Sequence, residues 1–293
     1  MTNNIFKLLI VAFAMIMVSC GDDENATDNQ LNLTISGLED LGEGYAYEGW
    51  IMVDGSPKTT GVFTVNENGT PSQTSFDIDE DDLQAATAFI LTIEPSPDPD
   101  PGPSDVHILA GDFTGDNASL NVGHAAALGN DFAASTGGYI LATPTDGADN
   151  NENSGVWFLD PGAGPGAALS LPTLPAGWAY EGWAVIDGTP VTTGTFTSVS
   201  GADDAAPFSG SEPGPAYPGE DFLTNAPNGL TFPTDLRGAT IVVSVEPVPD
   251  NSPNPFTLKP LVGMTASDAE DHTLLSMDNN ALATNPTGSA AKR

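Results

Sequence analysis

The stretch GYAYEGWIMVDGSPKTTGVFT at residues 44–64 returns as GWAYEGWAVIDGTPVTTGTFT at residues 177–197, with 14 of the 21 aligned residues identical. Within residues 45–53 the side chains alternate between two faces, and both faces carry apolar bulk, as in a central strand of a packed sheet. An Asp-Gly pair follows in each copy and predicts a hairpin turn. The glycine between two aromatic residues, Gly49 or Gly182, predicts a bulge or a close backbone approach.

The duplication continues beyond this stretch. FILTIEPSPD at residues 89–98 aligns with IVVSVEPVPD at residues 241–250, and the offset between the copies rises from 133 to 152. The second copy therefore carries 19 additional residues, which fall in the Gly-, Pro- and acid-rich segment 200–230. Each repeat is on the order of a hundred residues, which is the size of a domain. Residues 117–166 occur in the first copy only, and they either complete the first domain or join the two.

Turn residues interrupt the chain throughout, with 32 Gly and 25 Pro, and the apolar runs between them are short and β-branched or aromatic. This pattern predicts an all-β fold of tandem antiparallel β-sandwich (immunoglobulin-like) repeats. The acidic run at residues 77–82 predicts the first turn of a short helix. We expect a first repeat with extra strands at 31–166, a second repeat at 167–280 and a disordered tail at 281–293.

The N-terminus has the features of an export signal. Lys7 precedes an apolar run of about 11 residues, too short for the roughly 20 that span a bilayer, so residues 1–19 are predicted to be a signal peptide. Met17-Val-Ser-Cys20 resembles the lipobox of bacterial lipoproteins, in which the cysteine is lipidated. Residues 20–30 then form a lipidated Cys20 and a disordered tether. An ordinary cleaved signal or an uncleaved anchor is the alternative. We expect an outer-membrane lipoprotein that faces the periplasm or the cell surface.

The charge balance excludes two classes of partner. Six Lys and Arg face 40 Asp and Glu, giving a net charge of −34. Nucleic-acid binding requires clustered cations, and anionic lipid surfaces repel such a chain, so the membrane is reached only through the anchor. The single cysteine leaves no internal disulfide, so the core is held by burial alone.

No catalytic constellation is found, and we expect that the protein is not an enzyme; a hydrolase with paired carboxylates is the weakest alternative. His107, His124 and His272 lack metal-ligand spacing, so no cofactor is expected. Calcium is the one alternative. The oxygen-rich run 146–153 offers Asp146, Asp149 and Asn151 as ligands, although it is equally typical of a polar turn.

Four aromatic residues of the repeated stretches are candidate binding residues: Tyr47, Trp50, Tyr180 and Trp183. Exposed rings of this kind stack on sugars, whereas a β-sandwich core uses the same residues buried, with their polar atoms paired. The two-sided apolar strand favours the core. In that case the adjacent Glu48 and Glu181 each require a hydrogen-bond donor.

The order of these motifs resembles the C-terminal domain of anti-sigma-K factors. The residues that carry the resemblance are Leu174-Pro175, Gly177, Tyr180, Trp183, Asp187-Gly188, Pro190, Gly194, Phe196 and Glu246-Pro247, with Tyr47, Trp50, Asp54-Gly55, Pro57, Gly61, Phe63 and Glu94-Pro95 in the first copy. The resemblance implies an extracytoplasmic β domain, and the sigma-binding module of that family has no counterpart here. We therefore expect a non-catalytic, lipid-anchored cell-envelope protein that binds an unknown protein or serves a structural role. A glycan-binding surface lipoprotein is the alternative.

Overall fold

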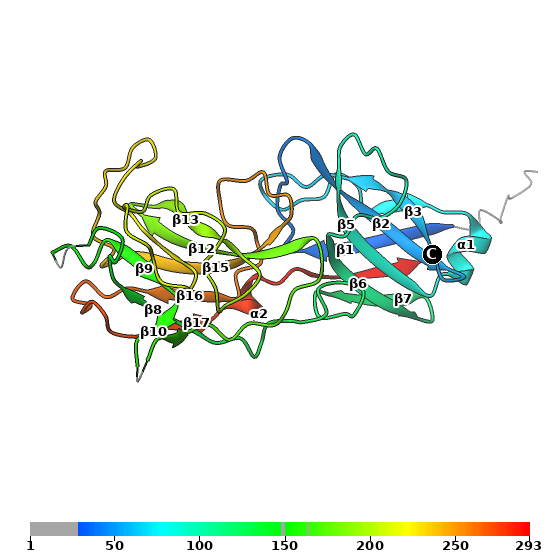
Figure 1. Cartoon of the computed structure of the whole chain (residues 1–293). Helices are drawn as coiled ribbons and strands as arrows, with labels where there is room; N and C mark the ends of the chain where they lie inside the picture. Colours follow the sequence, from blue (N-terminus) through cyan, green and yellow to red (C-terminus); the bar gives the residue numbers. More distant parts are fainter. Residues whose placement is uncertain (1–28, 148–149, 163) are drawn as a thin grey trace, which may run out of the picture.

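The computed structural model describes residues 29–147, 150–162 and 164–293, and strands dominate them (Figure 1). The predicted signal peptide, Cys20, most of the tether and Asp149 lie outside the described residues. Two antiparallel sheets of eight strands each account for most of the fold, which confirms the predicted all-β class. Within the described residues, neither helix has the length and apolar character needed to cross a membrane.

The first sheet has the strand order β3-β2-β5-β6-β7-β18-β1-β4. Its strands are β1 (Gln30–Ser36), β2 (Tyr45–Val53), β3 (Ser56–Phe63), β4 (Ser75–Asp77), β5 (Ala88–Pro95), β6 (His107–Thr114), β7 (Asn117–Asn121) and β18 (Thr287–Lys292). The helix α1 (Glu80–Ala85) begins at Asp79, whose side chain accepts hydrogen bonds from two backbone N–H groups of the first turn. The acidic run thus forms the predicted short helix.

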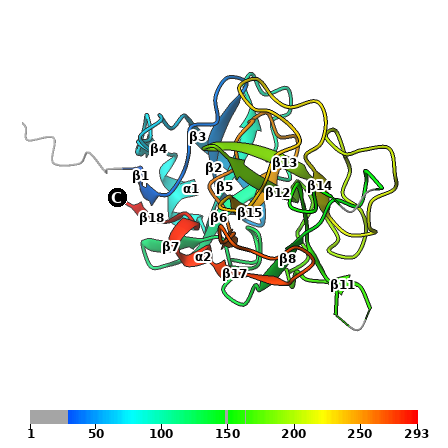
Figure 2. The ribbon, with the colours of Figure 1, turned by 90° about the vertical axis from the view of Figure 1, so that its left-hand side faces the viewer.

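The second sheet has the order β13-β12-β15-β16-β17-β8-β9-β14 and lies beside the first along the length of the molecule (Figures 1 and 2). Its strands are β8 (Gly137–Leu141), β9 (Gly155–Trp157), β12 (Trp178–Ile186), β13 (Thr189–Phe196), β14 (Gly219–Asp221), β15 (Thr240–Pro247), β16 (Leu261–Met264) and β17 (Leu275–Asn279). A separate two-stranded sheet joins β10 (Leu159–Asp160) and β11 (Gly166–Ala167), and the helix α2 spans Ala281–Thr284.

The repeated stretches form the β2–β3 and β12–β13 hairpins. Both Asp-Gly turns have positive φ at both residues, for example 50° at Asp54 and 76° at Gly55, as a tight two-residue hairpin requires. The register shifts opposite Gly49 and Gly182, where Thr60 and Thr193 are the additional residues of the partner strands. The predicted glycine positions therefore face bulges.

One hydrophobic core runs through both sheets. In each sheet a tyrosine stacks on the phenylalanine of the neighbouring strand, Tyr47 on Phe63 and Tyr180 on Phe196, both with ring centroids 5.6 Å apart. Phe132 packs edge-on against Tyr180 at 6.5 Å, which brings the segment between β7 and β8 into the core of the second sheet.

Two of the predicted domain boundaries are wrong. Strands β8 and β9, expected in the first repeat, lie in the second sheet, and the tail 281–293, expected to be disordered, forms α2 and β18. Strand β18 lies between β7 and β1 in the first sheet, and its Ala290 is fully buried. Backbone pairing on both sides and one small buried side chain hold a segment whose composition gives no strand signal.

Candidate functional site

All four candidate aromatic residues lie in the core. The exposed fractions are 0% for Tyr47, 2% for Trp50, 1% for Tyr180 and 2% for Trp183. The two tyrosine hydroxyls donate to the backbone carbonyls of Glu39 and Pro172. No ring face is left for a sugar to stack on, so these residues are packing residues in this structure.

The glutamates beside the tryptophans are buried and paired. Glu48 is 7% exposed and Glu181 is 6% exposed. The hydroxyls of Thr59 and Thr192, one strand away on β3 and β13, donate to Glu48 and Glu181 respectively. These are the donors that burial of the two carboxyls requires.

A second glutamate joins each network from the adjacent central strand. In the second repeat the indole N–H of Trp183 donates to Ser244 at 2.8 Å, and Ser244 donates to Glu246. The backbone N–H of Phe256 also donates to Glu246, at 2.9 Å to Oε1.

The first repeat builds the same chain with different hydroxyl residues. Trp50 donates to Thr92 at 2.9 Å, Thr92 donates to Glu94, and the backbone N–H of Ser104 donates to Glu94 at 2.8 Å. The sequence motif Glu-Pro at the end of β5 and β15 therefore marks a buried carboxyl in both repeats.

Three carboxyl groups converge in the second repeat. One oxygen atom each of Glu181, Glu246 and Asp250 lies within 4.8 Å of the others, and we call these residues the carboxyl cluster. Glu181 and Glu246 are buried and Asp250 is exposed, so the cluster opens to solvent at Asp250. Among the described residues this is the one group of three acidic or histidine side chains close enough to hold a metal ion.

Burial governs the protonation of the carboxyl cluster. It raises the pKa of Glu181 to about 7 and the pKa of Glu246 to about 8, and it also raises the pKa of Asp250; the negative charge of Asp250 adds to the shift at both glutamates. The cluster can therefore retain protons near neutral pH. Three carboxylate oxygens are also ligands that a hard cation such as Ca²⁺ accepts.

Asp146 and Asn151, the two predicted calcium residues that the structure describes, are not part of the carboxyl cluster. Asp149 lies outside the described residues, and the backbone carbonyl of Asn151 accepts a hydrogen bond from Thr143 at 2.7 Å. Asp146 lies near enough to Asp221 to contribute to the raised pKa of that buried carboxyl. In the sequence, the run at 146–153 lies between β8 and β9.

The additional residues of the second repeat form a cavity of about 400 Å³ that sequence reasoning did not identify. Asp203 faces it, and burial raises the pKa of Asp203 to about 7. Thr145 and Trp157, from the segment found only in the first copy, line the same cavity. The two segments that are not repeated therefore meet in one place.

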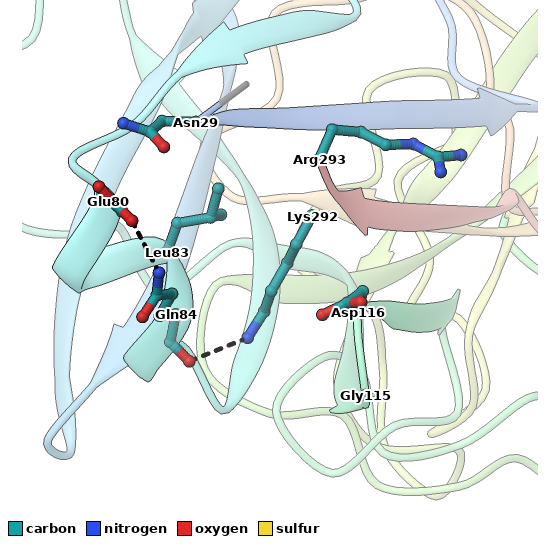
Figure 3. A pocket seen from close by; sticks show the side chains of 8 residues that line it. All are labelled: Asn29, Glu80, Leu83, Gln84, Gly115, Asp116, Lys292 and Arg293. Carbon is teal, nitrogen blue, oxygen red and sulfur yellow. Dashed lines mark hydrogen bonds between the residues drawn. The ribbon is translucent and has the colours of Figure 1, made fainter. Parts of the chain in front are cut away.

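A larger cavity, of about 580 Å³, lies where β1 begins and β18 ends (Figure 3). The Lys292 ammonium group donates to the backbone carbonyl of Ala86 at 2.7 Å and lies over the Phe113 ring. The residues that line the cavity are Asn29, Glu80, Leu83, Gln84, Gly115, Asp116, Lys292 and Arg293.

The three histidines make local contacts. His107 Nδ1 lies 2.8 Å from the Ala126 carbonyl, His124 Nε2 lies 3.5 Å from Asp112, and His272 Nδ1 lies 3.0 Å from Asp271. None of the three belongs to the carboxyl cluster.

Comparison with protein families finds a resemblance in the first repeat. Residues 22–105 match the family model described as anti-sigma-K factor rskA, C-terminal. No curated protein and no solved structure matches the chain. The matched range covers β1 to β5, including the Tyr-Glu-Gly-Trp stretch and Glu94-Pro95. The first repeat of this chain is similar to the C-terminal domain of anti-sigma-K factors.

Proposed function

We propose that this chain is a non-catalytic, lipid-anchored cell-envelope protein that works as a binding or structural module built from duplicated domains of the anti-sigma-K C-terminal type. The observation that carries the proposal is the position of the repeated motif residues. Tyr47, Trp50 and Glu48, with their counterparts in the second repeat, are buried, and their side chains are hydrogen-bonded to threonine or serine hydroxyls or to the backbone. The residues that the two repeats share therefore stabilise the fold of each sheet and do not form an exposed binding site.

In this proposal, lipidated Cys20 attaches the two sheets to the membrane. Cys20 follows a short apolar run, and eight residues lie between it and Asn29, where the described structure begins. A lipidated Cys20 anchored in the outer membrane would hold the two sheets in the periplasm or at the cell surface. The net charge of −34 would oppose, and not add to, attraction to anionic lipids.

A Cys20→Ala variant tests the anchor. Wild-type protein expressed in a gram-negative host is expected to incorporate a fatty-acid label and to sediment with membranes, whereas Cys20→Ala is expected to lose the label and appear in the soluble fraction. Ser19→Ala, which keeps a small residue before the cysteine, is the matched control. Cys20→Ala protein that still sediments with membranes would rule out lipidation as the means of attachment.

The four residues proposed to stack on sugars in the glycan-binding alternative are buried in the core. A glycan array probed with the full chain separates it from the proposal. Binding that survives Trp50→Phe and Trp183→Phe but is lost on Asp203→Ala would move the function to the cavity of the second repeat.

A further inference from the structure

The strands β8 and β18 occupy the same place in the two sheets. Strand β18 lies between β7 and β1, and β8 lies between β17 and β9. Reading each sheet from its hairpin, β3-β2-β5-β6-β7 corresponds to β13-β12-β15-β16-β17, so β18 and β8 are the sixth strand in both. Strand β18 is the last strand of the second repeat, yet it completes the first sheet.

The registers show that this correspondence holds residue by residue. Gly288 pairs with Leu120, and Gly137 pairs with Met277, the corresponding buried residue of β17. Two positions on, Ala290 and Tyr139 are both fully buried. On the other side, Lys292 pairs with Leu31 of β1 as Leu141 pairs with Val156 of β9.

The sequence carries a trace of the same correspondence. Thr136-Gly137-Gly138 and Thr287-Gly288-Ser289 lie 151 residues apart, close to the offset of 152 that relates β5 to β15. A Cβ atom at Gly288 would lie 2.6 Å from the Thr34 backbone carbonyl oxygen, and one at Gly137 would lie 2.6 Å from the end of the Leu261 side chain, so both positions are closely packed. The two strands are therefore the same element of the duplicated unit.

We propose that the two repeats exchange their last strands: residues 30–141 form one unit and residues 155–292 the other, and the last strand of each unit completes the sheet of its partner. The facing edges of β7 and β1 form a binding site for a β-strand, and the strand that occupies it is β18, the last strand of the second unit. The segment 117–166, which has no counterpart by sequence alignment, thus contains two strands, β7 and β8, that correspond to β17 and β18 of the second unit. The exchange joins the two sheets into one interlocked body.

Cross-strand disulfides in the full chain test the exchange. Ser289 pairs with Ser119 on one side and with Thr34 on the other, and all three side chains are exposed. Directly opposed residues of antiparallel strands lie about 4.5–5.5 Å apart at Cα, which a disulfide spans. Since Cys20 is the single native cysteine, Ser119→Cys/Ser289→Cys and Thr34→Cys/Ser289→Cys are made in a Cys20→Ala background.

The expected result is that at least one of these two pairs closes a disulfide within one chain, seen as faster migration on a non-reducing gel and as a linked peptide by mass spectrometry. The control is Ser276→Cys/Ser289→Cys. Ser276 of β17 corresponds to Ser119, and it would lie opposite Ser289 if each unit kept its own last strand. A disulfide in this control pair, links between two chains, or no link at either pair in folded protein would each overturn the proposal.

Discussion

Gly49 and Gly182 each face a threonine hydroxyl that leaves no room for a side chain. A Cβ atom at Gly182 would lie 2.2 Å from Thr193 Oγ1 and 2.6 Å from the Phe158 ring. We expect Gly182→Ala to lower the free energy of unfolding by about 1–3 kcal/mol, the usual cost of overpacking a core, as measured by urea denaturation. Gly201→Ala is the matched control, because nothing lies within 4 Å of its added methyl group. Equal stability of the two variants would show that the contact with Thr193 does not require glycine at position 182.

The buried carboxyls make stability depend on pH in an unusual direction. The pKa values of Glu181 and Glu246 are raised from 4.5 to about 7 and about 8, so the folded state binds protons that the unfolded chain has released. This stabilisation is complete below pH 4.5 and is lost as the pH rises through 7 to 8. These shifts correspond to at most about 3 kcal/mol for Glu181 and about 5 kcal/mol for Glu246. In chelator, the melting temperature is expected to fall between pH 5 and pH 9.

Glutamine variants identify the groups responsible. Glu181→Gln/Glu246→Gln is expected to melt at a higher temperature than wild type at pH 9 and within a few degrees of it at pH 5, whereas the exposed Glu270→Gln is expected to follow wild type. A wild-type melting temperature that is flat or rising over this range contradicts the assignment. Added Ca²⁺ that stabilises wild type but not the double variant at pH 8 would show that the carboxyl cluster binds the ion.

Sequence reasoning reached part of this site. It placed Glu48 and Glu181 next to buried tryptophans and required a donor for each, and the donors Thr59 and Thr192 lie in the same repeated stretch. The pairing of Glu246 was not predictable, because its donors are a serine on the same strand and the backbone of Phe256 in a loop. Loop conformation decides that contact, and local sequence pattern does not determine it.

At the scale of elements, β18 is the strand whose placement is easiest to test. Ala290 is fully buried between β7 and β1, whereas its neighbour Ser289 is exposed. We expect Ala290→Asp to destabilise the protein by about 3 kcal/mol or more, because it places an unpaired charge in the core, and Ser289→Asp to change stability by about 0.5 kcal/mol or less. If residues 281–293 were disordered, both substitutions would be neutral in urea denaturation.

The sequence predicted those elements that have their own local signal. The hairpins have Asp-Gly turns, the central strands are apolar on both faces, and α1 has an acidic first turn. Strand β18 reads TGSAAK, which has little apolar alternation, and it is ordered by pairing with strands far away in the sequence. Such a strand is determined by tertiary pairing, so propensity could not identify it.

At the scale of the whole molecule, duplication was predictable and the assembly of the two copies was not. The aligned stretches fixed the offset between the repeats, but the Tyr-Glu-Gly-Trp stretch lies inside each sheet and has no bearing on which strand closes it. The boundary between the repeats lies between β8 and β9 in the sequence. Strand β8 of the first repeat completes the second sheet, and strand β18 of the second repeat completes the first. The two sheets should therefore unfold together and not in separate steps.

The central claim is that the two repeats form one interlocked body. Cutting the chain between β8 and β9 tests it most directly. A protease site inserted after the exposed Gly147 would yield one fragment ending after β8 and another beginning before β9. We expect the cut protein to elute as a single species of the intact size in native gel filtration, and its fragments to separate only in denaturant. Fragments that separate under native conditions, or that exchange freely with a tagged cut protein, would contradict the account.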